Sequence, residues 1–171
     1  RMGGGYIRTY NNSGRETSYL GTGSDNSGQL RIYDKQGETR SYIGDGYLQA
    51  YNQFGERTIF LGTGTNGGGY LRTYNFNGQE SIYVGTGADS SGQIRIYDNA
   101  GETGSFLGSG YFRTYNRFGK LTTFIGNASD GGGYLRTNNK FETETAFLGT
   151  NNANEGLINL NDKFGQSFWI R

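Results

Sequence analysis

The sequence contains no cysteine, no histidine and no proline, and it has a single tryptophan. Without cysteine and histidine, the chain lacks the parts of a usual zinc site, a thiol nucleophile or a serine–histidine relay. Without proline it is neither collagen nor a polyproline linker. The net charge of +1 gives no electrostatic indication of nucleic-acid binding. No apolar run approaches membrane-spanning length, so membrane insertion is not expected. These absences lead us to expect no enzyme, no metal site and no cofactor.

Glycine and aromatic residues are abundant, whereas aliphatic residues are scarce. Glycine supplies 32 of the 171 residues, and Tyr, Phe and Trp supply 14, 11 and 1. A disordered chain of this low aliphatic content would carry high net charge and few aromatic residues. The composition therefore indicates an ordered chain that has little material for a large core.

Internal repeats cover nearly the whole chain. Segments of the form G-Y-L-R-T-Y-N-x-x-G-x-x-x-x-x-L-G recur with steps of 23 or 18 residues, and a higher period of 64 residues follows from the step order. We treat residues 1–171 as a single repeat array, in which the atypical residues 156–171 form a terminal cap. The repeats start at Gly5, Gly28, Gly46, Gly69, Gly92, Gly110, Gly133 and Gly156.

Each repeat predicts two strands joined by a turn. In the first strand, residues 69–75, Leu71 and Thr73 point to one face, and Tyr70, Arg72 and Tyr74 point to the other. Asn or Asp then opens a turn that has glycine three residues later, a type I turn signature. The predicted turn pairs are Asn11 with Gly14, Asp34 with Gly37, Asn52 with Gly55, Asn75 with Gly78, Asp98 with Gly101, and Asn116 with Gly119.

The pairing of the two strands is open at this stage. A three-residue loop with a glycine bulge would put Leu71 on the same face as Tyr83, whereas a two-residue loop would group Leu71 with Val84. Turn chemistry favours the first arrangement and face chemistry the second. A β-arc, in which the strands pair with neighbouring repeats or chains, removes the conflict, and we favour it. The expected fold is all-β without α-helix, an elongated tandem-repeat β-solenoid or a multi-chain β-helix fibre.

The motif G-x-L-x-x-Y-N-x-x-G-x-x-x-x-x-L-G-T-G in tandem resembles the glycine-punctuated β-repeats of bacterial surface fibres and phage-type tail-fibre shafts. It also resembles, more distantly, the hairpin-sized repeats of choline- and glucan-binding cell-wall modules, which use Trp-rich motifs. The first resemblance implies a structural, extracellular fibre or filament subunit, located at a cell surface or on a virion.

Arginine residues that lie between aromatic neighbours are the main candidate for a binding surface. They could form a sugar- or anion-binding ladder, or an outer layer in which guanidinium groups stack on rings. The second reading is purely structural. The candidate ladder comprises Tyr6, Arg8, Tyr10, Arg31, Tyr33, Tyr70, Arg72, Tyr74, Arg95, Tyr97, Tyr111, Arg113, Tyr115, Tyr134 and Arg136.

The other candidate functional sites have weaker support in the sequence. The carboxylates after the turns recur in several repeats, so they indicate a solvated strand edge rather than a glycosidase pair. The loops at residues 22–28 and 86–92 distantly resemble calcium-binding nonapeptide repeats, but each offers one carboxylate. Threonine at the fifth position raises an ice-binding solenoid as a third function, although its alternation with Ile and Ala favours a core role.

Self-association is the expected partner interaction. Burial of the side chains at two or three aliphatic positions per repeat hardly offsets the loss of conformational entropy when about twenty residues become ordered, at ~1 kcal/mol or more each. Three chains around one axis would pool their aliphatic faces, and head-to-tail stacking would pair terminal repeats. The 64-residue period could instead mean three repeats per turn of a monomeric coil. The alternative function is a carbohydrate- or cell-wall-binding module, with surface glycans as partners.

Overall fold

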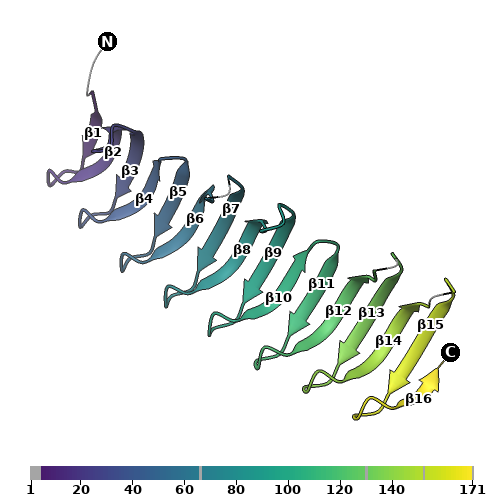
Figure 1. Cartoon of the computed structure of the whole chain (residues 1–171). Coiled ribbons are helices and arrows are strands. Elements are labelled where there is room, and N and C mark those ends of the chain that lie inside the picture. The colour runs from purple at the N-terminus through teal and green to yellow at the C-terminus, as the bar shows by residue number, and fades with distance from the viewer. Residues whose placement is uncertain (1–4, 66, 130, 152, 171) are drawn as a thin grey trace. The chain divides into compact units, whose positions relative to one another are not determined.

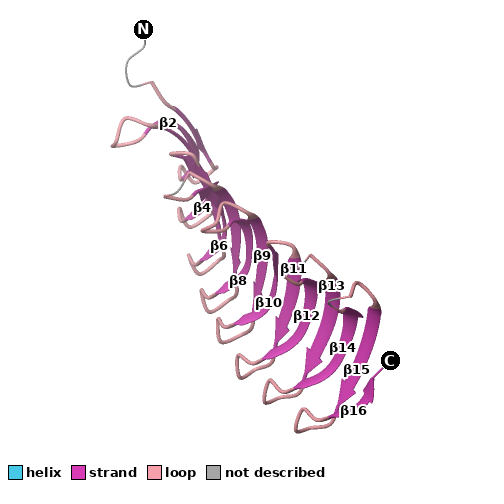
Figure 2. Cartoon of the chain, turned by 45° about the vertical axis from the view of Figure 1, so that its right-hand side comes forward, coloured by secondary structure: helices cyan, strands magenta, loops and turns pink. Residues whose placement is uncertain are grey.

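The computed structural model describes residues 5–65, 67–129, 131–151 and 153–170 of the chain. The chain divides into two compact units, Arg1–Thr86 and Gly87–Arg171. Within the described residues there are sixteen strands and no helix, as Figure 2 shows by its magenta strands and pink loops. The expectation of an all-β chain without α-helix is confirmed. Arg171, the end of the expected cap, lies outside the described residues.

Every repeat supplies two strands, an odd-numbered one that starts near the repeat glycine and an even-numbered one that follows the turn. In the first unit they are β1 (Ile7–Tyr10), β2 (Glu16–Thr22), β3 (Gly28–Tyr33), β4 (Thr39–Gly44), β5 (Tyr47–Tyr51), β6 (Arg57–Thr63), β7 (Gly69–Tyr74) and β8 (Glu80–Thr86). In the second unit they are β9 (Gly92–Tyr97), β10 (Thr103–Gly108), β11 (Tyr111–Tyr115), β12 (Leu121–Asn127), β13 (Gly133–Asn138), β14 (Glu144–Thr150), β15 (Gly156–Asn161) and β16 (Ser167–Ile170).

Each unit is an open antiparallel sheet in which every strand pairs with the strand next to it in the chain. The two strands of one repeat pair directly, for example β7 with β8, so each repeat is a β-hairpin. Figure 1 shows the strands of each unit in one layer, with the turns between β7 and β8 and between β13 and β14 as narrow loops. The β-arc that the sequence favoured is therefore wrong, because the strands of a repeat hydrogen-bond to each other.

The turn inside each repeat follows the predicted pattern. In the fourth repeat the N–H of Gly78 donates to the carbonyl of Asn75 at 3.0 Å, and the N–H of Asn75 donates to the carbonyl of Gln79 at 2.8 Å. Gly78 has φ +75°, a left-handed conformation that glycine adopts without a steric cost. This is a three-residue hairpin loop with a glycine bulge.

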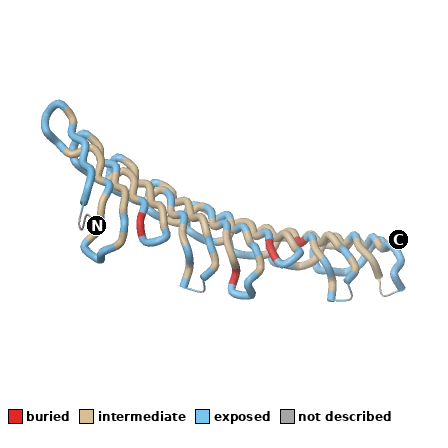
Figure 3. The backbone as a smooth tube through the Cα atoms, turned by 90° about the horizontal axis from the view of Figure 1, so that it is seen from above, coloured by how far each residue is buried: buried red, intermediate tan, exposed pale blue. Residues whose placement is uncertain are grey.

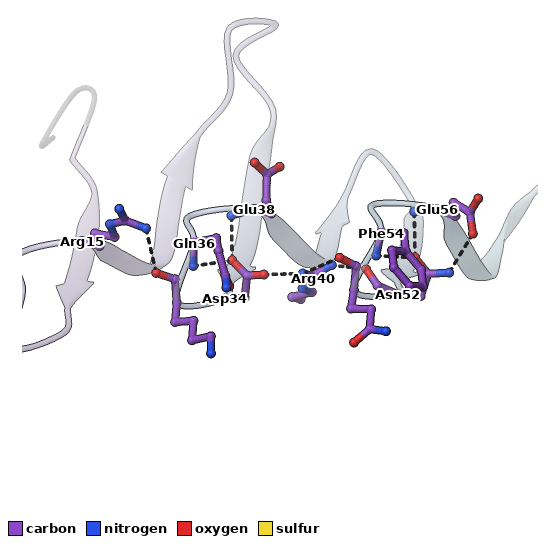
Figure 4. A network of polar contacts seen from close by, with 10 residues as sticks. Arg15, Asp34, Gln36, Glu38, Arg40, Asn52, Phe54 and Glu56 are labelled. Atoms are coloured by element: carbon purple, nitrogen blue, oxygen red, sulfur yellow. Dashed lines mark hydrogen bonds and ion pairs between the residues drawn. The ribbon is translucent and has the colours of Figure 1, made fainter. Parts of the chain in front are cut away.

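The side chain that opens each turn also holds it closed. Figure 4 shows two examples, in which Oδ1 of Asp34 accepts from the backbone N–H of Gln36 and Glu38, both at 2.9 Å. Oδ1 of Asn52 accepts in the same way from Phe54 and Glu56. Such Asx hydrogen bonds explain why Asn or Asp occupies the first position of these turns.

Neighbouring turns are tied to each other along the same sheet edge. Arg15 donates from Nη1 to the carbonyl oxygen of Lys35 at 3.0 Å. Arg40 forms an ion pair with Asp34 and donates to the carbonyl oxygen of Asn52. In the second unit, Nδ2 of Asn139 donates to the carbonyl oxygen of Lys163 at 3.1 Å. The bonds to the three carbonyl oxygens link the turns of neighbouring hairpins, so the turns along this edge are connected to each other.

The 18-residue repeats are short because their connection to the next repeat is a two-residue turn. Asp45 and Gly46 have φ values of +50° and +77°, and Ser109 and Gly110 have +50° and +81°. Two consecutive positive φ angles define a type I′ turn, which matches the twist of paired strands. The Asp45-Gly46 dipeptide is the local signal that identifies a hairpin, and the sequence interpretation did not use it.

A second bulge in each repeat resolves the conflict between turn chemistry and face chemistry. The register shifts by one residue between Thr73 and Tyr74, so that Tyr74 pairs with Glu80 and Thr73 pairs with Ile82. Ser81 is the extra residue, and its hydroxyl lies 2.8 Å from the hydroxyl of Thr73. A one-residue shift moves every later side chain to the other face. The glycine-bulge loop therefore coexists with Leu71 opposite Val84.

The sheet has almost no interior. Figure 3 shows intermediate and exposed backbone over most of the chain, with buried segments only in short patches. Among the described residues the one buried hydrophobic side chain is Phe124, which is 6% exposed. One face carries aliphatic residues and small hydroxyl residues, and the other carries aromatic and arginine residues. The positions described include no helix that is long and apolar enough to cross a membrane.

Candidate functional site

The aromatic and arginine face carries the ring contacts and most of the cation–π contacts of the described residues. Alternation along the first strand of each repeat puts the predicted ladder on this face. Arg72 of β7 lies opposite Phe60 of β6 and opposite Tyr83 of β8. Tyr70 of β7 lies opposite a glycine on each side, Gly62 and Gly85. Around β7 the face therefore has arginine between rings in one row and tyrosine between glycines in the next.

The rings form a continuous stack within each unit. Consecutive ring centroids lie 4.8–5.8 Å apart, at interplanar angles of 15–31°. Aromatic pairs at this separation contribute about 0.5–1.5 kcal/mol each beyond their area burial. The stacks run through Tyr42, Tyr47, Phe60, Tyr70 and Tyr83 in the first unit, and through Phe106, Tyr111, Phe124, Tyr134 and Phe147 in the second.

The glycines at the ends of the second strands make room for these rings. A Cβ atom added at Gly62 would lie 2.7 Å from Cε1 of Phe60 and 2.8 Å from Cβ of Tyr47. At Gly85 it would lie 2.5 Å from Cβ of Tyr70. Each ring covers the glycine of its own or the neighbouring strand, so these glycines are required by close packing rather than by backbone conformation.

Guanidinium groups lie over the rings. The Cζ atom of Arg72 is 4.7 Å from the Tyr70 centroid, and that of Arg113 is 4.3 Å from the Tyr111 centroid. Cation–π contacts of this kind stabilise exposed sites by about 0.5–1 kcal/mol. Among the described residues, the Nε atoms of five arginines are buried and donate no hydrogen bond of good geometry, namely Arg31, Arg72, Arg95, Arg113 and Arg136.

Acidic partners are present in only some repeats. Nε of Arg8 lies 3.4 Å from a carboxylate oxygen of Glu16, and Nε of Arg72 lies 3.3 Å from one of Glu80. The residue equivalent to Glu80, paired with the last aromatic position of the first strand, is Thr103 in the fifth repeat and Leu121 in the sixth. The electrostatic environment of the arginines therefore differs from repeat to repeat.

Eight of the twelve rings that form ring contacts were not predicted from the sequence. The sequence interpretation placed Tyr6, Tyr70, Tyr111 and Tyr134 in the ladder, and the structure puts all four in ring contacts. The second-strand rings could not be assigned to a face while the register was open, whereas Tyr47 lies in a first strand, at the position of Tyr70, and could have been predicted. The missed ring residues are Tyr19, Tyr42, Tyr47, Phe60, Tyr83, Phe106, Phe124 and Phe147.

The loops that distantly resembled calcium repeats are turns closed by their own side chains. Oδ1 of Asp89 accepts from the hydroxyl of Ser91 at 2.6 Å, and its Oδ2 accepts from the hydroxyl of Ser109 at 2.9 Å. These bonds lower the pKa of the Asp89 carboxyl, with the hydroxyl of Ser91 as the main cause. The described part of the chain holds no group of three or more His, Cys, Asp or Glu residues that could bind a metal ion.

In comparisons with known proteins, the chain matches no family model and no curated protein.

Glycine packing against the rings yields a stability prediction. Gly62→Ala should lower the free energy of unfolding by about 1–3 kcal/mol, because the added methyl group overlaps Phe60 and Tyr47. Gly28→Ala is the matched control in the same unit, since its added Cβ meets nothing within 4 Å. Urea unfolding at one fixed protein concentration measures both. Equal losses for the two variants would show that the ring stack does not need the glycine.

The ring stack also predicts a pH effect. Burial raises the pKa of Tyr42 to about 12, with contributions from Tyr47 and from Asp45, whose Oδ2 lies 3.5 Å from the phenol oxygen. The unfolded tyrosine titrates near about 10, so the unfolded chain loses this proton first as the pH rises. The free energy of unfolding should therefore fall between these two pH values.

Tyr42→Phe should remove that part of the pH dependence, and an ultraviolet difference titration against the parent protein should locate the Tyr42 pKa. Asp45→Ser introduces serine, which the second unit has at the equivalent turn position as Ser109. This variant should lower the pKa of Tyr42. A Tyr42 phenol that titrates at the ordinary tyrosine value would contradict this account.

Proposed function

We propose that the protein is a structural subunit of an extracellular fibre or filament, and that copies of the chain associate through the aliphatic face. The observation that carries the proposal is the absence of a layer over this face. A sheet with one aliphatic face is stable when another layer buries that face. Neither unit provides such a layer from its own described residues.

The uncovered side chains are large and regularly placed. Leu61 pairs with Leu71 across β6 and β7, and Leu71 pairs with Val84 across β7 and β8. Leu61 is 50% exposed, and Leu148 of the second unit is 53% exposed. The second row of the same face holds Thr, Ser, Ala and Ile, and none of its paired positions is charged. An uncharged aliphatic face of this kind is typical of a subunit interface.

The exposed area is larger than a monomer of this mass needs. The chain exposes 11363 Å², whereas a compact protein of 18.8 kDa exposes about 8300 Å². The excess of roughly 3000 Å² per chain exceeds the area of about 800 Å² that each partner buries in a standard protein–protein interface. The chain therefore exposes enough surface for a stable interface, and association through one face would remove part of the excess.

A second copy of the chain is the partner that fits this face best. The face carries an aliphatic side chain on each successive strand, about 4.8 Å apart, so an identical sheet presents side chains at the same spacing. Of the architectures expected from the sequence, we therefore propose the multi-chain one, with a trimer or a head-to-tail filament as the assembly. The fibre resemblance supports the same reading.

A glycan-binding module is the second candidate, and it would use the Tyr/Arg face. Sugar rings bind on free aromatic faces, but the rings of this protein are stacked on each other and on guanidinium groups. The centroid separation of 4.8 Å between Phe124 and Tyr134 leaves no room for a ligand between these rings. The ring geometry thus favours a structural role for the stack.

Sedimentation velocity and electron microscopy of the purified chain test the proposal. At micromolar concentration we expect a species larger than a monomer and particles longer than one chain. Leu61→Glu places a charge at the centre of the aliphatic face of the first unit and should shift the protein to smaller species. A cooperative, concentration-independent monomer in the parent protein would overturn the proposal.

The matched control is Phe54→Glu. Phe54 is an equally apolar residue of the same unit, 76% exposed, but it lies in a turn and not on the aliphatic face. The Phe54→Glu variant should leave the association state unchanged. Circular dichroism should show the same strand content for Phe54→Glu and Leu61→Glu. If both variants dissociate the assembly, the effect is one of net charge and the aliphatic face is not the interface.

A further inference from the structure

We propose that the second unit holds a binding site for a ligand with an oxyanion group, formed by Arg95 and Arg113 on either side of Phe106. The shared chemistry is that of a carboxylate or a sulfate, either free or carried by an acidic sugar. The site goes beyond the structural role and does not depend on it.

The site is a hollow on the aromatic and arginine face. It has a volume of about 400 Å³, and Arg95 of β9, Phe106 of β10 and Arg113 of β11 contribute to its lining. Phe106 pairs with both arginines, so one ring separates two guanidinium-bearing strands that lie about 10 Å apart. Tyr111 and Tyr115 complete the aromatic part of the wall.

The two arginines are hydrogen-bond donors without acidic partners. Neither Arg95 nor Arg113 forms an ion pair among the residues that the structure describes. Their Nε atoms are buried, as is that of Arg72, so the Nη groups are the donors that would meet a ligand. The Arg95 guanidinium donates from Nη2 to Oε1 of Gln93, a neutral acceptor, at 3.4 Å. A planar guanidinium group suits an oxyanion because it offers several N–H donors in a fixed geometry.

In other repeats a glutamate lies beside the equivalent arginine and neutralises its charge. Glu80 lies beside Arg72 at 3.3 Å, and Glu16 lies beside Arg8 at 3.4 Å. Thr103 stands at the position of Glu80 in the fifth repeat, and Leu121 stands there in the sixth. Arg95 and Arg113 therefore lack the neighbouring glutamate that Arg72 and Arg8 have, and an external anion can take that place.

One carboxylate does line the hollow, that of Glu102. The residue is exposed, and among the described residues it forms no ion pair with either guanidinium group. Its backbone N–H and carbonyl close the preceding turn with Asp98. Glu102 therefore does not pair with Arg95 or Arg113, although it places a carboxylate in the lining of the hollow.

The first unit contains a natural comparison. One 64-residue period earlier, Arg31 and Thr39 correspond to Arg95 and Thr103, but Gln49 replaces Arg113. This location has a single guanidinium group and should bind oxyanions more weakly. The first unit thus shows that the fold accepts glutamine at the position equivalent to Arg113.

Nuclear magnetic resonance of the arginine Nε–H groups in the full chain tests the site. Sodium sulfate, sodium glucuronate and neutral glucose are titrated at constant ionic strength, with Arg95→Gln and Arg113→Gln used to assign the signals. We expect saturable shifts of the Arg95 and Arg113 signals with sulfate or glucuronate and none with glucose. Arg72, which has its own carboxylate, should not respond. A response to glucuronate alone would identify an acidic sugar as the ligand, and a response to both would identify the oxyanion itself.

Thr103→Glu is the decisive variant, because it recreates the arrangement of Arg72 and Glu80. It should weaken anion binding by roughly tenfold or more and leave the strand content unchanged. Arg113→Gln, which copies the first unit, should weaken it as well. The proposal is overturned if neither anion produces saturable shifts, if all arginine signals shift together, or if Thr103→Glu binds as tightly as the parent protein.

Discussion

A sheet of one layer has no interior, so the side-chain contacts that stabilise it must run along the sheet rather than across a core. In each unit this requirement is met by the ring stack on one face, where each aromatic residue covers a glycine and touches the next ring. Gly62, Phe60 and Tyr47 show the arrangement most clearly, since any side chain at the glycine would displace the two rings. This packing explains why the chain is rich in glycine and aromatic residues and poor in aliphatic residues.

The second bulge makes the ring stack possible. The glycine-bulge turn alone would have put Tyr83 on the face of Leu71. Ser81 adds one residue and returns Tyr83 to the face of Arg72. The sequence predicted the first-strand faces and the turns, because alternation and Asx–Gly spacing are local signals. It did not predict the bulge, because a single serine or threonine in a strand carries no sign that it is unpaired.

The same limit applies to the candidate site. The ladder of Tyr70, Arg72 and Tyr74 could be predicted from alternation within one strand. The rings that surround Arg72 from the neighbouring strands could not, because their face depends on the register. The difference between Glu80 and Thr103 had no meaning in the sequence until the pairing showed that both lie beside an arginine of the preceding strand. Only then was it clear that Arg95 and Arg113 lack the acidic neighbour that Arg72 has.

The two faces of the sheet thus have different roles in this account. The ring face stabilises the single layer from within the chain, and the aliphatic face is the one that we propose binds another copy. Isotope-filtered nuclear Overhauser spectroscopy on a mixture of labelled and unlabelled chains tests this division most directly. The account predicts intermolecular cross-peaks to the methyl groups of Leu61, Leu71 and Val84 and none to the rings of Phe60 and Tyr70. Intermolecular contacts at the rings, with none at these methyl groups, would contradict it.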